Sequence, residues 1–111
     1  MQIQNCTPHE IILVAADGTP LLSLTPSGVL PRVSTTPTVV GSLAVEGHSI
    51  PLRRTVLGEV EGLPAQQADV TLVVSRMLAQ AAPERTDLVF PDDTVRDDKG
   101  RIVGCRALAR A

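Results

Sequence analysis

Short runs of apolar residues separated by turn sequences dominate the chain, and this pattern predicts strands rather than helices. Two pairs of runs have the form of β-hairpins: Glu10–Ala16 and Leu21–Leu24 flank Asp17-Gly18, and Thr94–Arg96 and Arg101–Ala107 flank Asp97–Gly100. Glycine adopts the left-handed conformation that tight turns need, so Asp-Gly or Lys-Gly between such runs favours a hairpin. The sequence therefore predicts two antiparallel hairpins.

Further strands are expected wherever apolar or β-branched residues cluster. They are Gln2–Asn5, Val29–Ser34, Val39–Val45, Ile50–Leu57, Asp69–Val73 and Leu88–Phe90. Breaks are expected at Thr35–Pro37, Glu46-Gly47, Gly58–Pro64 and Pro91–Asp93, since these segments contain Pro, Gly or Asp.

One segment has helical spacing instead. Its apolar residues Val74, Met77, Leu78 and Ala81 follow the spacing i, i+3, i+4, i+7 of one helix face. Ser75 is placed to cap the start of this helix, and Pro83 would end it. Together these elements predict a mainly β (α+β) fold: one small antiparallel β domain over residues 1–111, with hairpins and one short packed helix.

Composition narrows the function. Hydrophobic residues make up 43% of the chain, but Phe90 is its one aromatic residue, so the core must be aliphatic. A stacking surface for single-stranded nucleic acid needs several rings and is excluded. The net charge of −2 argues against binding to duplex nucleic acid, which favours a basic surface.

No membrane segment or targeting signal is expected, because the longest apolar run near the start, Ile11–Ala16, is far too short to span a bilayer. Cys6 and Cys105 are predicted to be reduced thiols in a cytoplasmic protein. No metal or other cofactor is expected, since Cys6 and His9 lack a second pair of ligands.

The chain has none of the common catalytic motifs for nucleophilic elbows, phosphate-binding loops or zinc proteases. A Cys–His nucleophile pair from Cys105 with His9 or His48 is a weak alternative, because it rests on residue types alone.

The basic residues are nine Arg and a single Lys, Lys99. This bias is explained either by GC-rich coding or by a need for the planar guanidinium group, which binds phosphate bidentately. Arg53 and Arg54 lie within an expected strand, so they face opposite sides, and either both are solvent-exposed or one faces a site. Arg106 follows Cys105 in a strand otherwise nearly free of charge. Arg101 and Arg32 are weaker candidates of the same kind.

Two readings of the segment around Phe90 stay open. The ring is either a core residue or a surface on which a ligand ring stacks. Asp92 and Asp93 either lie in a solvent-exposed turn or accept hydrogen bonds from the hydroxyl or amine groups of a ligand.

Four stretches of the chain resemble a family of small phage-encoded proteins. They are Ile3–Ile11, which is similar to an N-terminal "NLTPH" pattern, Arg54–Pro64, Val74–Arg76 and Pro91–Arg106. Cys6 departs from this pattern, which has Leu there. The group resembles the anti-Thoeris "sponge" proteins, which sequester cyclic ADP-ribose isomers.

This resemblance implies a phage anti-defence protein that acts in the cytoplasm of the infected bacterium. It would bind the signal made by a TIR-domain defence enzyme without cleaving it, and so would not be an enzyme. The resemblance also implies a homo-oligomer, up to a hexamer, with pockets shared between protomers and separate sites for the cyclic oligonucleotides of CBASS defences. Of the family's ligand-binding residues, it carries over an Arg of the central strand (Arg54, or less surely Arg53) and Arg106.

The residues themselves are compatible with that function. The candidate ligand-binding set is Arg54, Arg106, Phe90, Asp92, Asp93, Arg53, Arg101 and Arg32. Two alternatives remain: a phage accessory protein that binds and inhibits a host protein, and a small phosphodiesterase-like enzyme.

Overall fold

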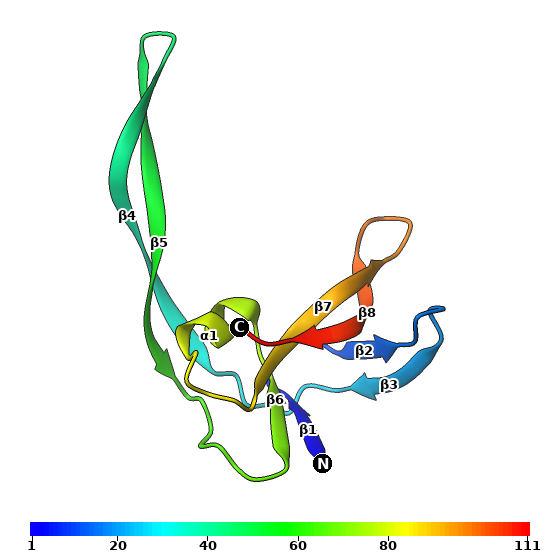
Figure 1. Cartoon of the computed structure of the whole chain (residues 1–111). Helices are drawn as coiled ribbons and strands as arrows, with labels where there is room; N and C mark the ends of the chain where they lie inside the picture. The colour runs from blue at the N-terminus through cyan, green and yellow to red at the C-terminus, as the bar shows by residue number, and fades with distance from the viewer.

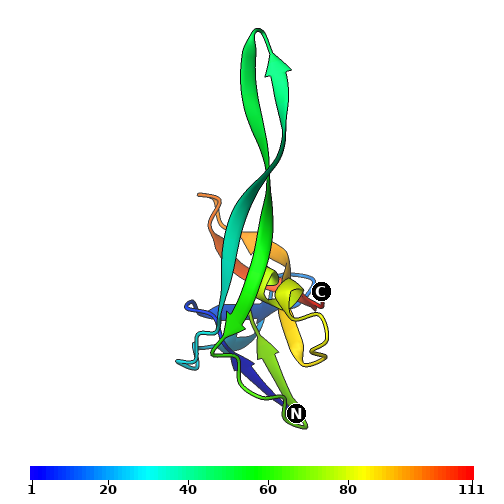
Figure 2. The same ribbon diagram turned by 90° about the vertical axis from the view of Figure 1, so that its left-hand side faces the viewer.

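The computed structural model describes all 111 residues and divides into two parts (Figure 1). The body is a six-stranded sheet with one helix. The arm is a long two-stranded ribbon made of β4 (Arg32–Val45) and β5 (His48–Glu61). In both views the far half of the arm stands clear of the body (Figures 1 and 2).

The sheet of the body is mixed. Its strands, in spatial order, are β1 (Gln2–Asn5), β6 (Val70–Val73), β7 (Leu88–Arg96), β8 (Ile102–Ala109), β2 (Ile11–Val14) and β3 (Pro20–Leu24). The pairs β2–β3 and β7–β8 are antiparallel, and parallel pairs β1–β6, β6–β7 and β2–β8 join them to the rest. The protein is therefore mainly β with one short helix, as predicted.

Both predicted hairpins are present. In β2–β3 the turn contains Gly18 at φ 92°, and the Asp17 carboxylate accepts a hydrogen bond of 2.9 Å from the Thr19 N–H. In β7–β8 the Asp97 carboxylate accepts hydrogen bonds of 2.9 Å from the N–H groups of Lys99 and Arg101. The acidic turn residues therefore accept hydrogen bonds from backbone N–H groups of their own turns.

One expected break lies inside a strand of the body. Pro91–Asp93 does not turn the chain, because β7 runs without interruption from Leu88 to Arg96. Asp92 is opposite Ala107 and Thr94 is opposite Cys105, so pairing with β8 continues across this segment. Within this continuous strand Asp93 has a positive φ of 48°, a conformation that Asp tolerates better than most residues.

Of the breaks expected in the arm, Thr35–Pro37 is wrong, and Gly58–Pro64 is wrong as far as Glu61. Thr35–Pro37 lies within β4, where Pro37 is opposite Thr55, and β5 continues through Gly58 to Glu61. A two-stranded ribbon has both outer edges free, so a proline without an N–H group fits there without removing a pairing bond. Glu46-Gly47 does form the expected turn, with both residues at positive φ.

Helix α1 (Arg76–Ala81) begins and ends close to the predicted signals. The Ser75 hydroxyl accepts a 3.2 Å hydrogen bond from the Leu78 N–H, and the helix stops just before Pro83. Its buried side differs from the expected one: Leu78 and Ala79 are buried, while Met77 is 44% exposed. With six residues, α1 is far too short to cross a membrane, and the chain has no other helix.

The core lies entirely within the body. Its main cluster consists of Cys6, Leu72, Val74, Leu78, Ala79, Ala82, Leu88 and Phe90. Val33 and Val60, at the base of the arm, pack against this cluster. No residue between Leu24 and Leu72 is fully buried, so the outer arm contributes nothing to the core.

Candidate functional site

A hollow of about 370 Å³ lies where the arm joins the body. We call it the arm-base pocket, and its lining residues are Cys6, Thr7, Pro8, Leu30, Pro31, Arg32, Ser75 and Leu78. They come from the loop after β1, the segment that leads into β4 and the start of α1. Its volume falls within the range of roughly 300–1,000 Å³ that is usual for small-molecule sites.

The floor of this pocket belongs to the core. Cys6 is 4% exposed and Leu78 is 2% exposed, so both are held by packing on the side away from the pocket. The Ser27 hydroxyl lies 3.9 Å from the Cys6 sulfur. An apolar floor of this kind suits a flat or hydrophobic part of a ligand.

A buried asparagine fixes the loop that forms one wall. The Asn5 side-chain amide is buried and donates hydrogen bonds to the carbonyl oxygens of His9 (2.7 Å) and Leu24 (2.9 Å). Its oxygen accepts hydrogen bonds from the Thr7 N–H (2.9 Å) and hydroxyl (2.6 Å). Every hydrogen-bonding atom of this side chain is engaged, so Thr7 is held in place before any ligand binds.

Arg32 brings positive charge to the lining of the pocket. It is the first residue of β4, it is exposed, and it takes part in none of the three ion pairs of the chain. Ser75 already accepts a bond as the helix cap, so its own hydroxyl proton is free to donate. An unpaired guanidinium, a free hydroxyl donor and an apolar floor can together bind an anionic group attached to a flat one.

The structure resolves the two readings of Phe90 in favour of the core. The ring is 8% exposed within the main cluster. The guanidinium carbon of Arg76 lies 5.8 Å from the ring centre, which is within the range of a cation–π contact. The ring is therefore packed in the core, with Arg76 placed over it, and little of its surface is open to a ligand.

The two candidate arginines of the β7–β8 hairpin each lie near a carboxylate of the same hairpin. An Arg106 nitrogen lies 3.6 Å from the Asp93 carboxylate, and an Arg101 nitrogen lies 3.9 Å from that of Asp97. Asp92 is exposed on the same strand as Asp93. The Arg106 charge is therefore partly balanced within its own hairpin.

Arg53 and Arg54 lie on the arm, where they are exposed and unpaired. They oppose Val39 and Thr38 respectively and so face opposite sides of the ribbon, as predicted from their adjacency. Arg54 lies on β5 of the arm and Arg106 on β8 of the body sheet, so the two belong to different parts of one chain (Figure 1).

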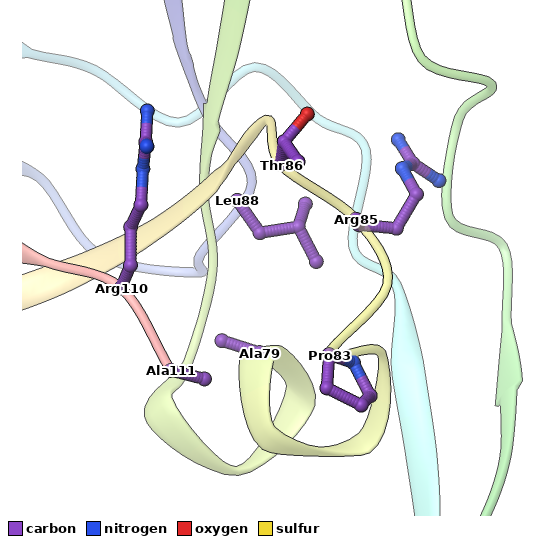
Figure 3. A pocket seen from close by; sticks show the side chains of 7 residues that line it. All are labelled: Ala79, Pro83, Arg85, Thr86, Leu88, Arg110 and Ala111. Carbon is purple, nitrogen blue, oxygen red and sulfur yellow. The ribbon is translucent and has the colours of Figure 1, made fainter.

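Two further hollows fit an anionic ligand less well. The first, beside the last residues of the chain, is lined by Ala79, Pro83, Arg85, Thr86, Leu88, Arg110 and Ala111 (Figure 3). It encloses about 180 Å³, which is below the usual range for a ligand site. The second, of about 490 Å³, lies beside β5, and its charged lining consists of Glu59, Glu84 and Arg85.

Arg85 is committed to a structural role in both of these hollows. It binds the Asp87 carboxylate through two nitrogens, at 2.8 and 2.7 Å, and donates to the Pro64 carbonyl at 2.8 Å. This bidentate hydrogen bonding lowers the pKa of Asp87 and raises that of Arg85. The pair ties the loop before β6 to the start of β7, and its charges cancel.

The possible nucleophile does not have the surroundings of a reactive thiol. Cys105 is 1% exposed, and burial raises the pKa of its thiol, which disfavours the thiolate. His9 and His48 are both exposed, His9 in the loop after β1 and His48 at the tip of the arm. Both cysteines are free thiols, and no cluster of side chains is arranged to hold a metal ion.

Of the candidate residues predicted from sequence, Arg32 alone lines the arm-base pocket. Thr7, Ser75 and Leu78 were not among those candidates. Ser75 could be recognised as a helix cap, but nothing in the sequence indicates that the segments around positions 7, 31 and 75 meet.

Comparison with known proteins adds no further constraint. No family model, no curated protein and no solved structure matches this chain.

Proposed function

We propose that this protein is a non-enzymatic binding protein that captures a small cyclic nucleotide, of the cyclic ADP-ribose type, in the arm-base pocket. It would act inside the infected bacterial cell as a phage anti-defence protein of the sponge type that its sequence resembles. The observation that carries this proposal is Arg32, an unpaired guanidinium at the wall of a pocket of ligand size.

The chemistry of the lining supports a nucleotide in particular. A cyclic ADP-ribose isomer combines a pyrophosphate, ribose hydroxyls and an adenine ring. Arg32 would bind the pyrophosphate, the Ser75 hydroxyl would donate to a phosphate or ribose oxygen, and the floor of Cys6 and Leu78 would contact the base. Sequestration needs no general base or nucleophile.

The resemblance extends the proposal to assembly. A homo-oligomer, up to a hexamer, would allow a second protomer to supply cations that one chain leaves outside the pocket. Arg53 and Arg54 are exposed and unpaired, so they are available for that role. Cyclic oligonucleotides of CBASS defences would bind at separate sites.

The test is calorimetric titration of the protein with a cyclic ADP-ribose isomer, followed by mass spectrometry of the ligand released on heating. We expect binding and release of the intact ligand. Arg32→Ala should raise the dissociation constant roughly ten- to a hundredfold, the range expected for the loss of one charge-assisted hydrogen bond. Arg110→Ala, which removes an arginine that lines the smaller hollow, should leave affinity unchanged.

Three results would contradict the proposal. They are no binding heat with any cyclic nucleotide, recovery of a hydrolysed product, or equal affinity of Arg32→Ala and the wild type. Hydrolysis would favour a phosphodiesterase-like enzyme. Absence of binding, together with co-purification of one defined host protein, would favour a host-protein inhibitor.

A further inference from the structure

Three residues of the arm-base pocket carry a side-chain oxygen or nitrogen: Thr7, Arg32 and Ser75. The Arg32 guanidinium can only donate hydrogen bonds. The Ser75 oxygen accepts from the Leu78 N–H, and its proton is left to donate. No carboxylate lines the pocket. The direction in which Thr7 forms hydrogen bonds therefore decides whether the pocket offers a ligand a side chain that acts only as an acceptor.

The direction of the Thr7 hydroxyl is fixed by Asn5. Both N–H groups of the Asn5 amide donate to backbone carbonyl oxygens, those of His9 and Leu24. The remaining polar atom of that amide is its oxygen, which lies 2.6 Å from the Thr7 hydroxyl and 2.9 Å from the Thr7 backbone nitrogen. An amide oxygen carries no proton, so the Thr7 hydroxyl must be the donor in this contact.

The second polar neighbour of the Thr7 hydroxyl imposes the same direction. The His9 carbonyl oxygen lies 3.1 Å from it and is also an acceptor. The single hydroxyl proton is therefore used within the loop, and the lone pairs of the oxygen are what remains for a ligand. Asn5 is 2% exposed and Thr7 is half-buried, so this arrangement exists before any ligand binds.

We infer that Thr7 determines the specificity of the pocket by accepting a hydrogen bond from an amine on the flat part of the ligand. This inference rests on the proposed function, in which the floor of Cys6 and Leu78 contacts the base. Thr7 directly follows Cys6 and lines the same pocket, so it lies beside that floor.

The amine of adenine and the carbonyl of hypoxanthine make opposite demands on Thr7. Adenine carries an exocyclic amine, which donates to the Thr7 lone pairs. Hypoxanthine carries a carbonyl oxygen at the same ring position, so two acceptors would face each other and neither would have a proton to share. A site built to hydrogen-bond one group rejects an analogue that leaves its polar atoms unpaired. The pocket should therefore prefer the adenine form of a cyclic nucleotide to the hypoxanthine form.

Calorimetric titration of the full chain with a cyclic ADP-ribose isomer and with its hypoxanthine counterpart tests the inference. The wild type should bind the adenine ligand at least about tenfold more tightly. Thr7→Val removes the hydroxyl but keeps the branched shape and the backbone N–H that donates to Asn5, and it should remove most of this preference. Thr7→Ser keeps a hydroxyl beside the same two acceptors and should retain the preference.

Thr86→Val is the matched control, because it makes the same chemical change at another hollow. The Thr86 hydroxyl accepts a 2.8 Å hydrogen bond from the Gln66 side chain, and Thr86 lines the smaller hollow beside the end of the chain. This variant should leave both dissociation constants unchanged.

The ratio of the two affinities separates the possible outcomes. Equal affinity of the wild type for the two ligands would overturn the inference and leave the proposed function standing, and this measurement holds even where Thr7→Val does not fold. Equal weakening of both ligands by Thr7→Val would also overturn it, because that result would mean a contact with a ribose hydroxyl or a disturbed loop. Binding of neither ligand to the wild type would overturn the proposed function and this inference with it.

Discussion

Strand β6 of the body and strand β5 of the arm carry similar aliphatic residues in opposite surroundings. In β6, Leu72 is 2% exposed and Val73 is fully buried. In β5, Ile50 and Leu52 are 47% and 41% exposed. Strand β6 pairs with both β1 and β7, whereas β5 pairs with β4 alone. Residue type therefore explains why both segments are strands, and the number of neighbouring elements explains which of them is stable within one chain.

The largest expected effect is a loss of stability when a core side chain of the body is truncated, compared with truncation of a side chain on the arm. Phe90→Ala should lower the free energy of unfolding by about 3–5 kcal/mol, because it removes a buried ring from the main cluster. Val39→Ala, on the arm and 64% exposed, should cost less than about 1 kcal/mol. Urea unfolding followed by circular dichroism measures both. Equal losses for the two variants would mean that the arm is as tightly packed as the body.

A smaller loss of stability is expected when the ion pair between Arg85 and Asp87 in the body is removed. Asp87→Asn should cost about 1.5–3 kcal/mol at pH 7, since it breaks the bidentate contact with Arg85. The folded pKa of Asp87 lies below its unfolded value, so the ionised form stabilises the fold above the unfolded pKa. That contribution is lost as the pH falls through the folded pKa.

The difference between wild type and Asp87→Asn should therefore shrink below about pH 4. Urea unfolding at pH 7 and pH 2.5 measures it. Asp98→Asn is the control, because Asp98 is exposed and forms no ion pair. A difference between wild type and Asp87→Asn that is the same at both pH values would contradict the role given to this pair.

The smallest effect concerns the turn at the tip of the arm. Glu46 has φ 48° and Gly47 has φ 81°, a combination for which Asn-Gly is preferred. Glu46→Asn should stabilise the turn by roughly 0.5–1 kcal/mol. Amide exchange over residues 43–50 should slow about two- to fivefold, while global unfolding by urea should stay unchanged. An equal gain in global stability would show that the arm and the body unfold as one unit.

Much of the fold could be predicted from local pattern. Asp17-Gly18, Asp97–Gly100 and Glu46-Gly47 identify the turns of all three hairpins, because the turn conformation depends on those residues alone. Ser75 and Pro83 mark the start and the end of the helix for the same reason. The breaks expected at Pro37 and Pro91 were wrong, because a proline is tolerated wherever the strand does not need its N–H group.

The pocket could be predicted only in part. Arg32 was recognisable as a cation in an apolar setting, but the loop at Thr7 and the helix cap at Ser75 meet it only through the tertiary fold. Phe90 and Arg106 have local partners, Arg76 and Asp93, that no sequence spacing indicates. The parallel pairings β1–β6 and β2–β8 likewise join segments far apart in sequence, and local periodicity does not encode them.

Arg32 belongs to two parts of the molecule at once, since it lines the pocket and is the first residue of β4. A partner that holds the arm therefore constrains the backbone that carries the pocket's cation. By thermodynamic linkage, if a contact on the arm favours one orientation of that backbone, a ligand that prefers the same orientation strengthens the contact by an equal free energy. Occupancy of the pocket and engagement of the arm would then be two coupled parts of one equilibrium.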